Sequence, residues 1–356
     1  MTTRPRIKID SRADVVEILP FMLGHFPDDS IVFHCPGPGF VDGPSMTCPL
    51  PDDPADWTTV ADSAACNFIH FAQSRGRAPG SEIVVYLCHD PRPGQSPEET
   101  AELLRPLADR LVEVLTEHRG CPERAFGLVA GRWWDFDCEV PGCCEGEPFP
   151  NLDNPDSLTV RLTQLGYTPG RRTRDILAEF QPLTPEAAPD LLRALRDEGT
   201  NHLLQRSGSN GRQTARDATH LLLEGAIGDF RRGGTELAHD VAARLIHGLQ
   251  DNHARDHALE FAEDDDLPHA RRLWTHLARC CVAPYTHYAV RVLTALAWVA
   301  WRQDDKITAR LALREALTAD PDYAMADMLH TGINNGTDPQ GLLDILREAR
   351  AERLNR

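Results

Sequence analysis

A change in hydrophobic periodicity is the feature that most constrains the fold of this chain of 356 residues. Before residue 206, short β-branched runs alternate with helical patterns, and the run 81–88 has the continuous apolar character of a central strand. After residue 211 only helical periodicity remains. The segment 207–211, Ser-Gly-Ser-Asn-Gly, has the composition of a flexible linker. The sequence therefore predicts an α/β domain over 1–206, a linker at 207–211 and an all-helical domain over 212–356.

Within the first domain, the order of the expected elements predicts a mixed sheet. Strands at 31–35 and 45–50 would form an antiparallel hairpin, and helices at 55–73 and 98–118 would flank the central strand 81–88. The apolar run 124–134 is interpreted as one further strand that leads directly into the segment after it. Together these elements predict an α/β fold in which parallel and antiparallel strands share one sheet.

Part of the helical domain has the spacing of a tetratricopeptide helix pair, over about residues 286–321. Ala309, Ala316 and Pro321 occupy the small-residue and turn positions of such a pair. One such pair is compatible with a purely structural packing role or with docking of a protein or peptide. In the docking interpretation, Trp298 and Trp301 would be exposed binding residues on a concave helical surface.

The charge balance restricts the partners. The chain has 37 Lys and Arg against 54 Asp and Glu, a net charge of -17. This charge disfavours phosphate-driven binding of nucleic acid and favours a protein or peptide partner. No apolar run approaches the roughly 18–20 residues of a membrane span, and no apolar stretch follows the N-terminus as in a signal peptide. We therefore expect no membrane partner and a cytoplasmic location.

The segment 131–146 concentrates residues with chemical potential. It begins with Arg132, Trp133 and Trp134, which we interpret as binding residues, because the two tryptophans would lie on opposite faces of a strand, one in the core and one at a pocket rim. Asp135 and Asp137 are two positions apart and would share one face of a continuing strand, as an acid–base pair or as ligands of a divalent ion.

Three cysteines in the same segment, Cys138, Cys143 and Cys144, allow several chemistries. They could be structural thiols, a disulfide or redox pair, a catalytic nucleophile, or zinc ligands. A zinc site would need a further ligand, and His89 at the end of the central strand could supply it, because strand ends converge on one edge of a sheet. The sequence leaves the cofactor unknown, and zinc is one candidate.

The catalytic interpretation expects five side chains to meet at the same edge of the sheet. The candidates are Asp135, Asp137, Cys138, His89 and His25, the last of which precedes the turn 27–30. Whether the protein is an enzyme stays open. The sequence contains no Walker loop, no Rossmann glycine fingerprint and no nucleophile elbow.

Several of these segments also resemble, in order, a known family. They are 19–32, the Arg132-Trp133-Trp134 run with the later Cys143-Cys144 pair, 255–256, 296–301 and 319–323. Together they resemble the actinobacterial domain-of-unknown-function family 4192. The resemblance covers nearly the whole chain. It implies an actinobacterial, cytoplasmic protein with an α/β N-terminal part and C-terminal helical repeats, and it implies no established activity.

Three hypotheses for the function follow. The first is a binding or scaffold protein, whose α/β domain recognises a peptide or small molecule and whose helical repeats dock a partner. The second is an enzyme acting on a peptide or metabolite, with a site around Asp135, Asp137, Cys138 and His89. The third is a zinc or thiol redox sensor. The first two differ in geometry, because the enzyme requires the catalytic candidates to meet in space.

Overall fold

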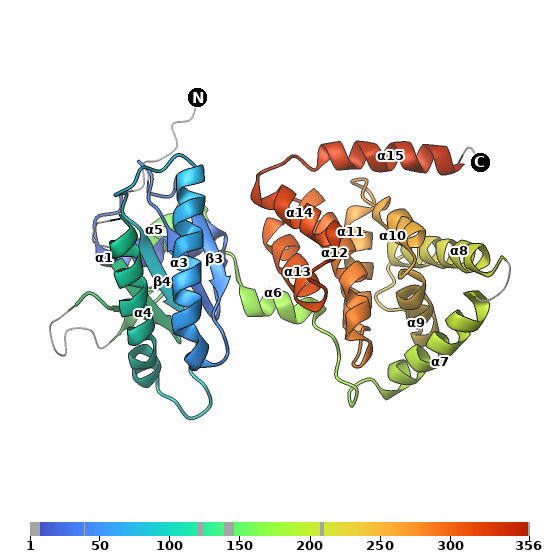
Figure 1. Cartoon of the computed structure of the whole chain (residues 1–356), viewed down its shortest axis with the longest axis horizontal. Helices are drawn as coiled ribbons and strands as arrows, with labels where there is room; N and C mark the ends of the chain where they lie inside the picture. The colour runs from blue at the N-terminus through green and yellow to red at the C-terminus, as the bar shows by residue number, and fades with distance from the viewer. Residues whose placement is uncertain (1–7, 39, 120–123, 139–145, 207–209, 355–356) are drawn as a thin grey trace. The chain divides into compact units, whose positions relative to one another are not determined.

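The computed structural model describes residues 8–38, 40–119, 124–138, 146–206 and 210–354. The chain divides into two compact units, Met1–Thr173 and Arg174–Arg356. We call them the α/β unit and the helical unit and describe each by itself (Figure 1).

The α/β unit contains a mixed sheet. In its described part, six strands have the order β3-β2-β4-β5-β6-β7. Only β4 and β5 are parallel, and every other neighbouring pair is antiparallel. This arrangement confirms the predicted α/β fold with a mixed sheet. The strands are β2 (Ser30–His34), β3 (Ser45–Pro49), β4 (Val84–Cys88), β5 (Arg124–Val129), β6 (Arg132–Asp135) and β7 (Glu147–Pro148).

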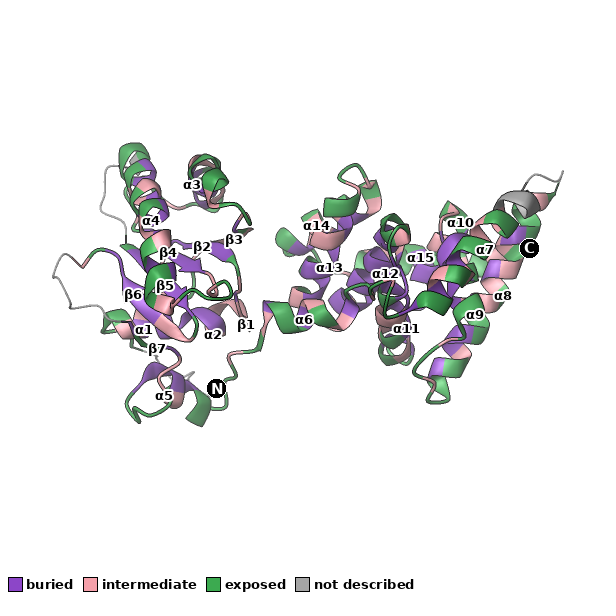
Figure 2. Ribbon diagram, turned by 90° about the horizontal axis from the view of Figure 1, so that it is seen from below, coloured by how far each residue is buried: buried purple, intermediate pink, exposed green. Residues whose placement is uncertain are grey.

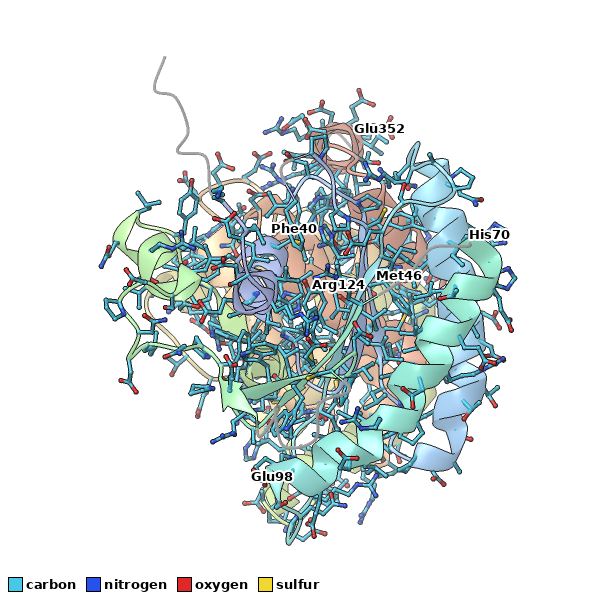
Figure 3. All side chains as sticks on the ribbon, turned by 90° about the vertical axis from the view of Figure 1, so that its left-hand side faces the viewer. Phe40, Met46, His70, Glu98, Arg124 and Glu352 are labelled. Atoms are coloured by element: carbon cyan, nitrogen blue, oxygen red, sulfur yellow. The ribbon has the colours of Figure 1, made fainter. Side chains whose placement is uncertain are left out.

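Helices cover both faces of this sheet, which is why β2 and β4 are buried along their whole length. On one face, α3 (Trp57–Ser74) and α4 (Pro97–Arg119) pack on alternate strand residues such as Phe33 and Val85. On the other face, α1 (Arg12–Glu17) and α2 (Leu19–Leu23) pack on Val32 and Tyr86. A short helix, α5 (Leu158–Gln164), packs beside α1. Figure 3 shows α3 and α4 side by side at one side of the unit.

The helical unit consists of helices, as predicted, and its core is continuous from Ile176 to Leu346. None of the helices in the described part of the chain has both the length and the apolarity that a membrane span requires. The helices are α6 (Thr173–Phe180), α7 (Pro189–Arg206), α8 (Gly211–Arg231), α9 (His239–Gly248), α10 (Asn252–Leu259), α11 (Leu267–Arg279), α12 (Ala289–Arg302), α13 (Lys306–Ala319), α14 (Ala324–Asn334) and α15 (Gln340–Leu354).

The boundary between the units lies earlier than the predicted linker. Ile176 and Phe180 of α6, with Leu191 and Leu195 of α7, belong to the core of the helical unit. Residues 207–209 lie outside the described part, and the segment 207–211 joins α7 to α8, two helices that pack on each other. Glycine and serine at this point therefore mark a connection within the unit. A segment of glycine and serine can join two domains or two helices of one domain, so its composition does not identify a domain boundary.

The pair α12–α13 occupies the segment for which tetratricopeptide spacing was predicted, and its turn has Asp304 in the left-handed region at φ 60°. The two tryptophans of this segment are not where the docking interpretation requires them. Trp298 is 1% exposed and Trp301 is 5% exposed, and the Trp298 indole donates to the Leu259 carbonyl at 3.0 Å. The expectation that they are exposed is wrong, because α12 is covered on almost every side (Figure 2).

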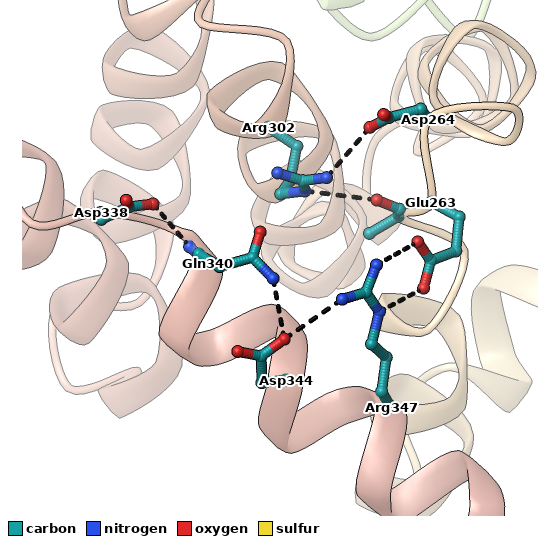
Figure 4. Close-up of polar contacts among 8 residues, drawn as sticks. Glu263, Asp264, Arg302, Asp338, Gln340, Asp344 and Arg347 are labelled. Atoms are coloured by element: carbon teal, nitrogen blue, oxygen red, sulfur yellow. Dashed lines mark hydrogen bonds and ion pairs between the residues drawn. The ribbon is translucent and has the colours of Figure 1, made fainter.

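The last helix, α15, is held largely by polar contacts. Arg347 makes two hydrogen bonds of 2.7 Å to the Glu263 carboxylate, and Arg353 reaches Glu260 at 2.7 Å (Figure 4 shows the first pair). Leu343 and Leu346 are its buried apolar residues, so charge pairing supplements a small apolar contact.

Five buried or half-buried histidines generate a prediction for stability. Burial lowers the pKa of each of five imidazoles, at His34, His220, His247, His276 and His330. The unfolded chain therefore binds protons at a higher pH than the folded chain, and the free energy of unfolding falls as pH drops below about 6.5. We expect the urea midpoint, followed by circular dichroism, to be lower at pH 5.5 than at pH 7.5. The variant His247→Gln should reduce this difference, whereas the exposed-site variant His70→Gln should not. A midpoint that stays constant or rises on acidification would contradict the prediction.

Candidate functional site

A tight turn after β5 decides where the predicted site residues lie. Ala130 has φ 48° and Gly131 has φ 75°, which is the backbone of a two-residue hairpin loop. The chain therefore reverses, and β6 pairs antiparallel with β5, with Arg132 opposite Val129 and Asp135 opposite Phe126. The prediction of one strand over 124–134 is wrong. The turn residues are Ala130 and Gly131, and they lack the Asn-Gly or Asp-Gly sequence that usually marks a two-residue hairpin loop.

This reversal separates the predicted catalytic residues. His89 follows the carboxyl end of β4, where its amide donates to the Leu128 carbonyl. Asp135 lies two strands away and about three residues down the sheet, which corresponds to a distance of more than about 10 Å. Asp137 and Cys138 continue toward the opposite edge, near the start of β5. The predicted convergence of these residues with His89 is therefore wrong.

Asp135 and Asp137 have structural partners. Asp135 is 4% exposed, pairs with Arg12 of α1 and accepts the Asp137 amide at 3.0 Å. Burial, and next the charge of Asp135, raise the pKa of Asp137. The two carboxylates therefore lie close together, as expected, but one of them is already neutralised by an arginine.

The neighbouring aromatic residues belong to the core. Trp133 and Trp134 do lie on opposite faces of the sheet, but they are only 7% and 3% exposed, so neither lines a pocket rim as expected. Arg132 donates to the Gly146 carbonyl, across the end of the cysteine segment. These three residues hold β6 in place rather than presenting a binding surface.

His89 is part of a carboxylate–imidazole pair at the carboxyl edge of the sheet. Its Nδ1 lies 2.6 Å from Asp29 Oδ1, and its Nε2 is buried without a hydrogen-bond partner among the described residues. This geometry could in principle make Nε2 a base. The other histidine among the candidates, His25 on β1 (His25–Phe26), contacts the Leu23 carbonyl through its ring Nδ1 at 3.2 Å.

Ion pairs occupy the rest of this edge. Strand β1 (His25–Phe26) pairs in parallel with β8 (Arg171–Arg172), which brings Arg172 to 2.8 Å from Asp28 and 3.6 Å from Asp90. Gly170 makes the pairing possible, because a Cβ at its φ of 78° would lie 1.8 Å from the Gly24 carbonyl oxygen.

The recess at this edge has a volume of only about 30 Å³. It can hold roughly one water molecule and has no room for a substrate. The edge therefore connects β1 and β8 to the main sheet and leaves little space beside the His89 ring.

No zinc site is assembled from the described residues. Cys143 and Cys144 lie outside the described part of the chain, and Cys138 and His89 belong to opposite edges of the sheet. Elsewhere in the described ranges, no group of three His, Cys, Asp or Glu side chains could hold a metal ion. The predicted set of Cys138, Cys143, Cys144 and His89 therefore cannot bind one ion together.

A larger cavity lies in the helical unit. Its volume is about 620 Å³, within the range of ligand pockets. We call it the α11 groove, because one face of α11 forms a wall of it. It is lined by Glu179 and Leu183 at the end of α6, Leu191 of α7, Glu236, Leu237 and His239 before and in α9, and Arg271, Arg272, Thr275, His276, Arg279 and Cys280 of α11 and its C-cap.

Two hydrogen bonds fix the walls of the α11 groove. The Leu183 amide donates to the Arg279 carbonyl at 2.9 Å, and the Leu237 amide donates to His276 Nε2 at 3.2 Å. Each joins a loop to α11, so the cavity is bordered by backbone held in place.

The groove contains a thiol and an imidazole, yet they are not a nucleophile and its base. Cys280 Sγ lies 3.5 Å from His276 Nε2. Burial raises the pKa of the Cys280 thiol to about 12, so the thiolate is scarce at neutral pH. Burial also lowers the pKa of His276, which keeps this imidazole neutral. The groove is suited to binding and not to thiol chemistry.

The groove was missed by sequence reasoning, although α11 carries a signal for it. Arg272, Thr275, His276 and Arg279 recur at helical spacing and form one polar face, opposite the buried Leu273 and Trp274. Such a face is usually solvated. What makes it a groove is the packing of α6 and of the loop before α9, which are distant in the sequence.

A charge-neutralising role for Arg172 yields a second prediction. Removing its guanidinium takes a cation away from Asp28, whose side chain is 8% exposed. We expect Arg172→Met to lower the free energy of unfolding of the α/β unit by about 2 kcal/mol, measured by native-state amide exchange of β4. The control is Lys8→Met, at a cation of the same unit whose side chain is 79% exposed. Equal exchange rates in the two variants would show that the pairing does not stabilise the sheet.

The comparisons with known proteins are consistent with the residues quoted for the family resemblance. No curated protein and no solved structure matches the chain. A family model does match, the domain of unknown function DUF4192, over residues 13–340. This match includes both the sheet and nearly all of the helical unit. The chain belongs to the DUF4192 family.

Proposed function

We propose that this protein is a binding protein, and that its ligand occupies the α11 groove of the helical unit. The observation that carries the proposal is the cavity of about 620 Å³, which is lined by apolar and charged side chains and is bordered by fixed backbone. Binding pockets combine an apolar lining with a few directed polar groups in this way.

The same geometry weighs against the enzyme hypothesis. Its candidates Asp135 and His89 lie more than about 10 Å apart, and the recess beside His89 has a volume of about 30 Å³. The sensor hypothesis depends on Cys143 and Cys144, which lie outside the described residues. Neither hypothesis gains support from a contact in the described part of the chain.

Three finer points belong to the same proposal. We interpret α12–α13 as a tetratricopeptide-like pair with a packing role, because its tryptophans are buried. A protein or peptide could supply the ligand, and nucleic acid is disfavoured by the net charge of -17. An actinobacterial origin and a cytoplasmic location, which the family resemblance implies, complete the proposal.

Filling the groove tests the function. Thr275 lines the groove, and Thr275→Trp would place an indole ring in it. We expect apolar fragments, with acidic, basic and neutral head groups tested separately, to bind the wild-type protein in saturation-transfer NMR. At least one class of fragment should no longer bind to Thr275→Trp, because the indole ring would occupy the space in the groove that the fragment needs.

The matched control is Thr331→Trp, at an exposed threonine of α14 outside the groove. It should bind the fragments as the wild type does, and circular dichroism checks that both variants are folded. Absence of any fragment binding to the wild type, or equal binding to both variants, would rule out the groove as the binding site.

A further inference from the structure

We infer that the α11 groove binds the carboxylate end of an apolar molecule, with Arg279 as its principal anchor. This inference rests on the binding function proposed above and adds the class of ligand. It follows from the distribution of apolar, cationic and anionic side chains around the groove.

The apolar part of the groove calls for an apolar ligand. Leu183 and Leu237 line it and are half-buried, whereas Leu191 is already buried in the core of the unit. Cys280 adds a neutral thiol, which behaves as a small apolar group. An aliphatic or aromatic chain placed here would remove both surfaces from water, which favours binding.

The arginines of the groove are not equivalent. Arg271 is engaged by α13, at 2.7 Å from Asp305 and 3.2 Å from Thr308. Arg272 donates to the Phe230 carbonyl at 2.7 Å and contacts His269. The Arg279 guanidinium, by contrast, has no hydrogen-bond or ion-pair partner among the described residues. An arginine can bind a carboxylate through two parallel hydrogen bonds, so Arg279 is the available anchor.

His276 offers a second donor on the same face of α11. Its Nε2 accepts the Leu237 amide, which places the proton of the neutral ring on Nδ1. Within the described ranges, Nδ1 makes no hydrogen bond. A ligand oxygen near Arg279 would therefore find an N–H donor three residues away on the helix.

The glutamates of the groove select the type of anion. Glu179 and Glu236 line it together with the arginines. Burial lowers the pKa of His276, and Glu236 lies close enough to offset part of that lowering. The two positive charges of Arg272 and Arg279 are therefore balanced by two negative charges in the lining, and Arg271 forms an ion pair with Asp305. A phosphate or nucleotide would gain little from so balanced a field. A monocarboxylate held by directed hydrogen bonds would be accommodated.

Paired acids and amides test the inference on the full chain. The probes are N-acetyl-Leu-Leu and its C-terminal amide, 4-phenylbutanoate and its amide, and phenyl phosphate, titrated by calorimetry at pH 7.5. We expect an acid to bind at least about tenfold more tightly than its amide, because a charge-assisted hydrogen bond is lost in the amide.

Arg279→Gln should remove this preference. The control Arg193→Gln, at an exposed arginine of the same unit, should keep it. Arg279 is itself exposed and its carbonyl still accepts the Leu183 amide, so the variant should fold. A preference in the peptide alone would identify a peptide terminus as the ligand, and one in 4-phenylbutanoate alone a small carboxylate; both support the inference.

Other results would overturn it. If acids and amides bind equally and Thr275→Trp abolishes both, the carboxylate inference fails while the binding function stands. If phenyl phosphate binds more tightly than either acid, the class of anion is wrong. If no probe of any class binds the wild-type protein, the proposed function itself fails.

Discussion

The burial of α12 is the constraint on which the helical unit depends. Every residue from Val292 to Trp301 is buried, so this helix must be surrounded by others. Helices α10, α11, α13 and α14 pack on it, and the Trp298 indole is hydrogen-bonded to the end of α10. Because α11 directs its apolar face toward α12, its polar face is left for the groove. The same packing removes both tryptophans of α12 from any docking surface, so the groove and the buried pair have one physical origin.

In the α/β unit, two residues at positive φ have a comparable effect. The Ala130–Gly131 turn sends Asp135, Asp137 and Cys138 away from the strand ends where His89 lies. What remains at that edge is a set of satisfied ion pairs around a recess of about 30 Å³. A site that is rich in titratable groups but closed to substrate is better explained by the attachment of β1 and β8 than by catalysis. A structural cluster and a catalytic site can contain the same residue types, so the size of the cavity and the exposure of the side chains distinguish them.

Much of the architecture could be predicted from the sequence, because it depends on local periodicity. The buried strand β4 and the helices α3 and α4 appear where apolar spacing placed them, and the chain after residue 211 is helical as expected. The hairpin after β5 could not be predicted, since Ala130 is an unusual residue for positive φ and Ala-Gly is not a common hairpin-turn sequence. The prediction of the domain boundary was wrong for another reason. Ile176 and Phe180 pack into the core of the helical unit, and local sequence does not show which core a helix joins. The groove could not be predicted either, because Leu183 and Leu237 lie far from Arg279 in the sequence and line one cavity with it only in the folded chain.

The central claim is that ligand binding belongs to α11 and not to the edge of the sheet. Hydrogen exchange with and without saturating N-acetyl-Leu-Leu tests this most directly, because both regions are followed in one experiment. Binding in the α11 groove should slow exchange at residues 234–239 and 275–281 and leave exchange at 88–90 and 128–131 unchanged. Protection at 88–90 and 128–131, with none along α11, would contradict it.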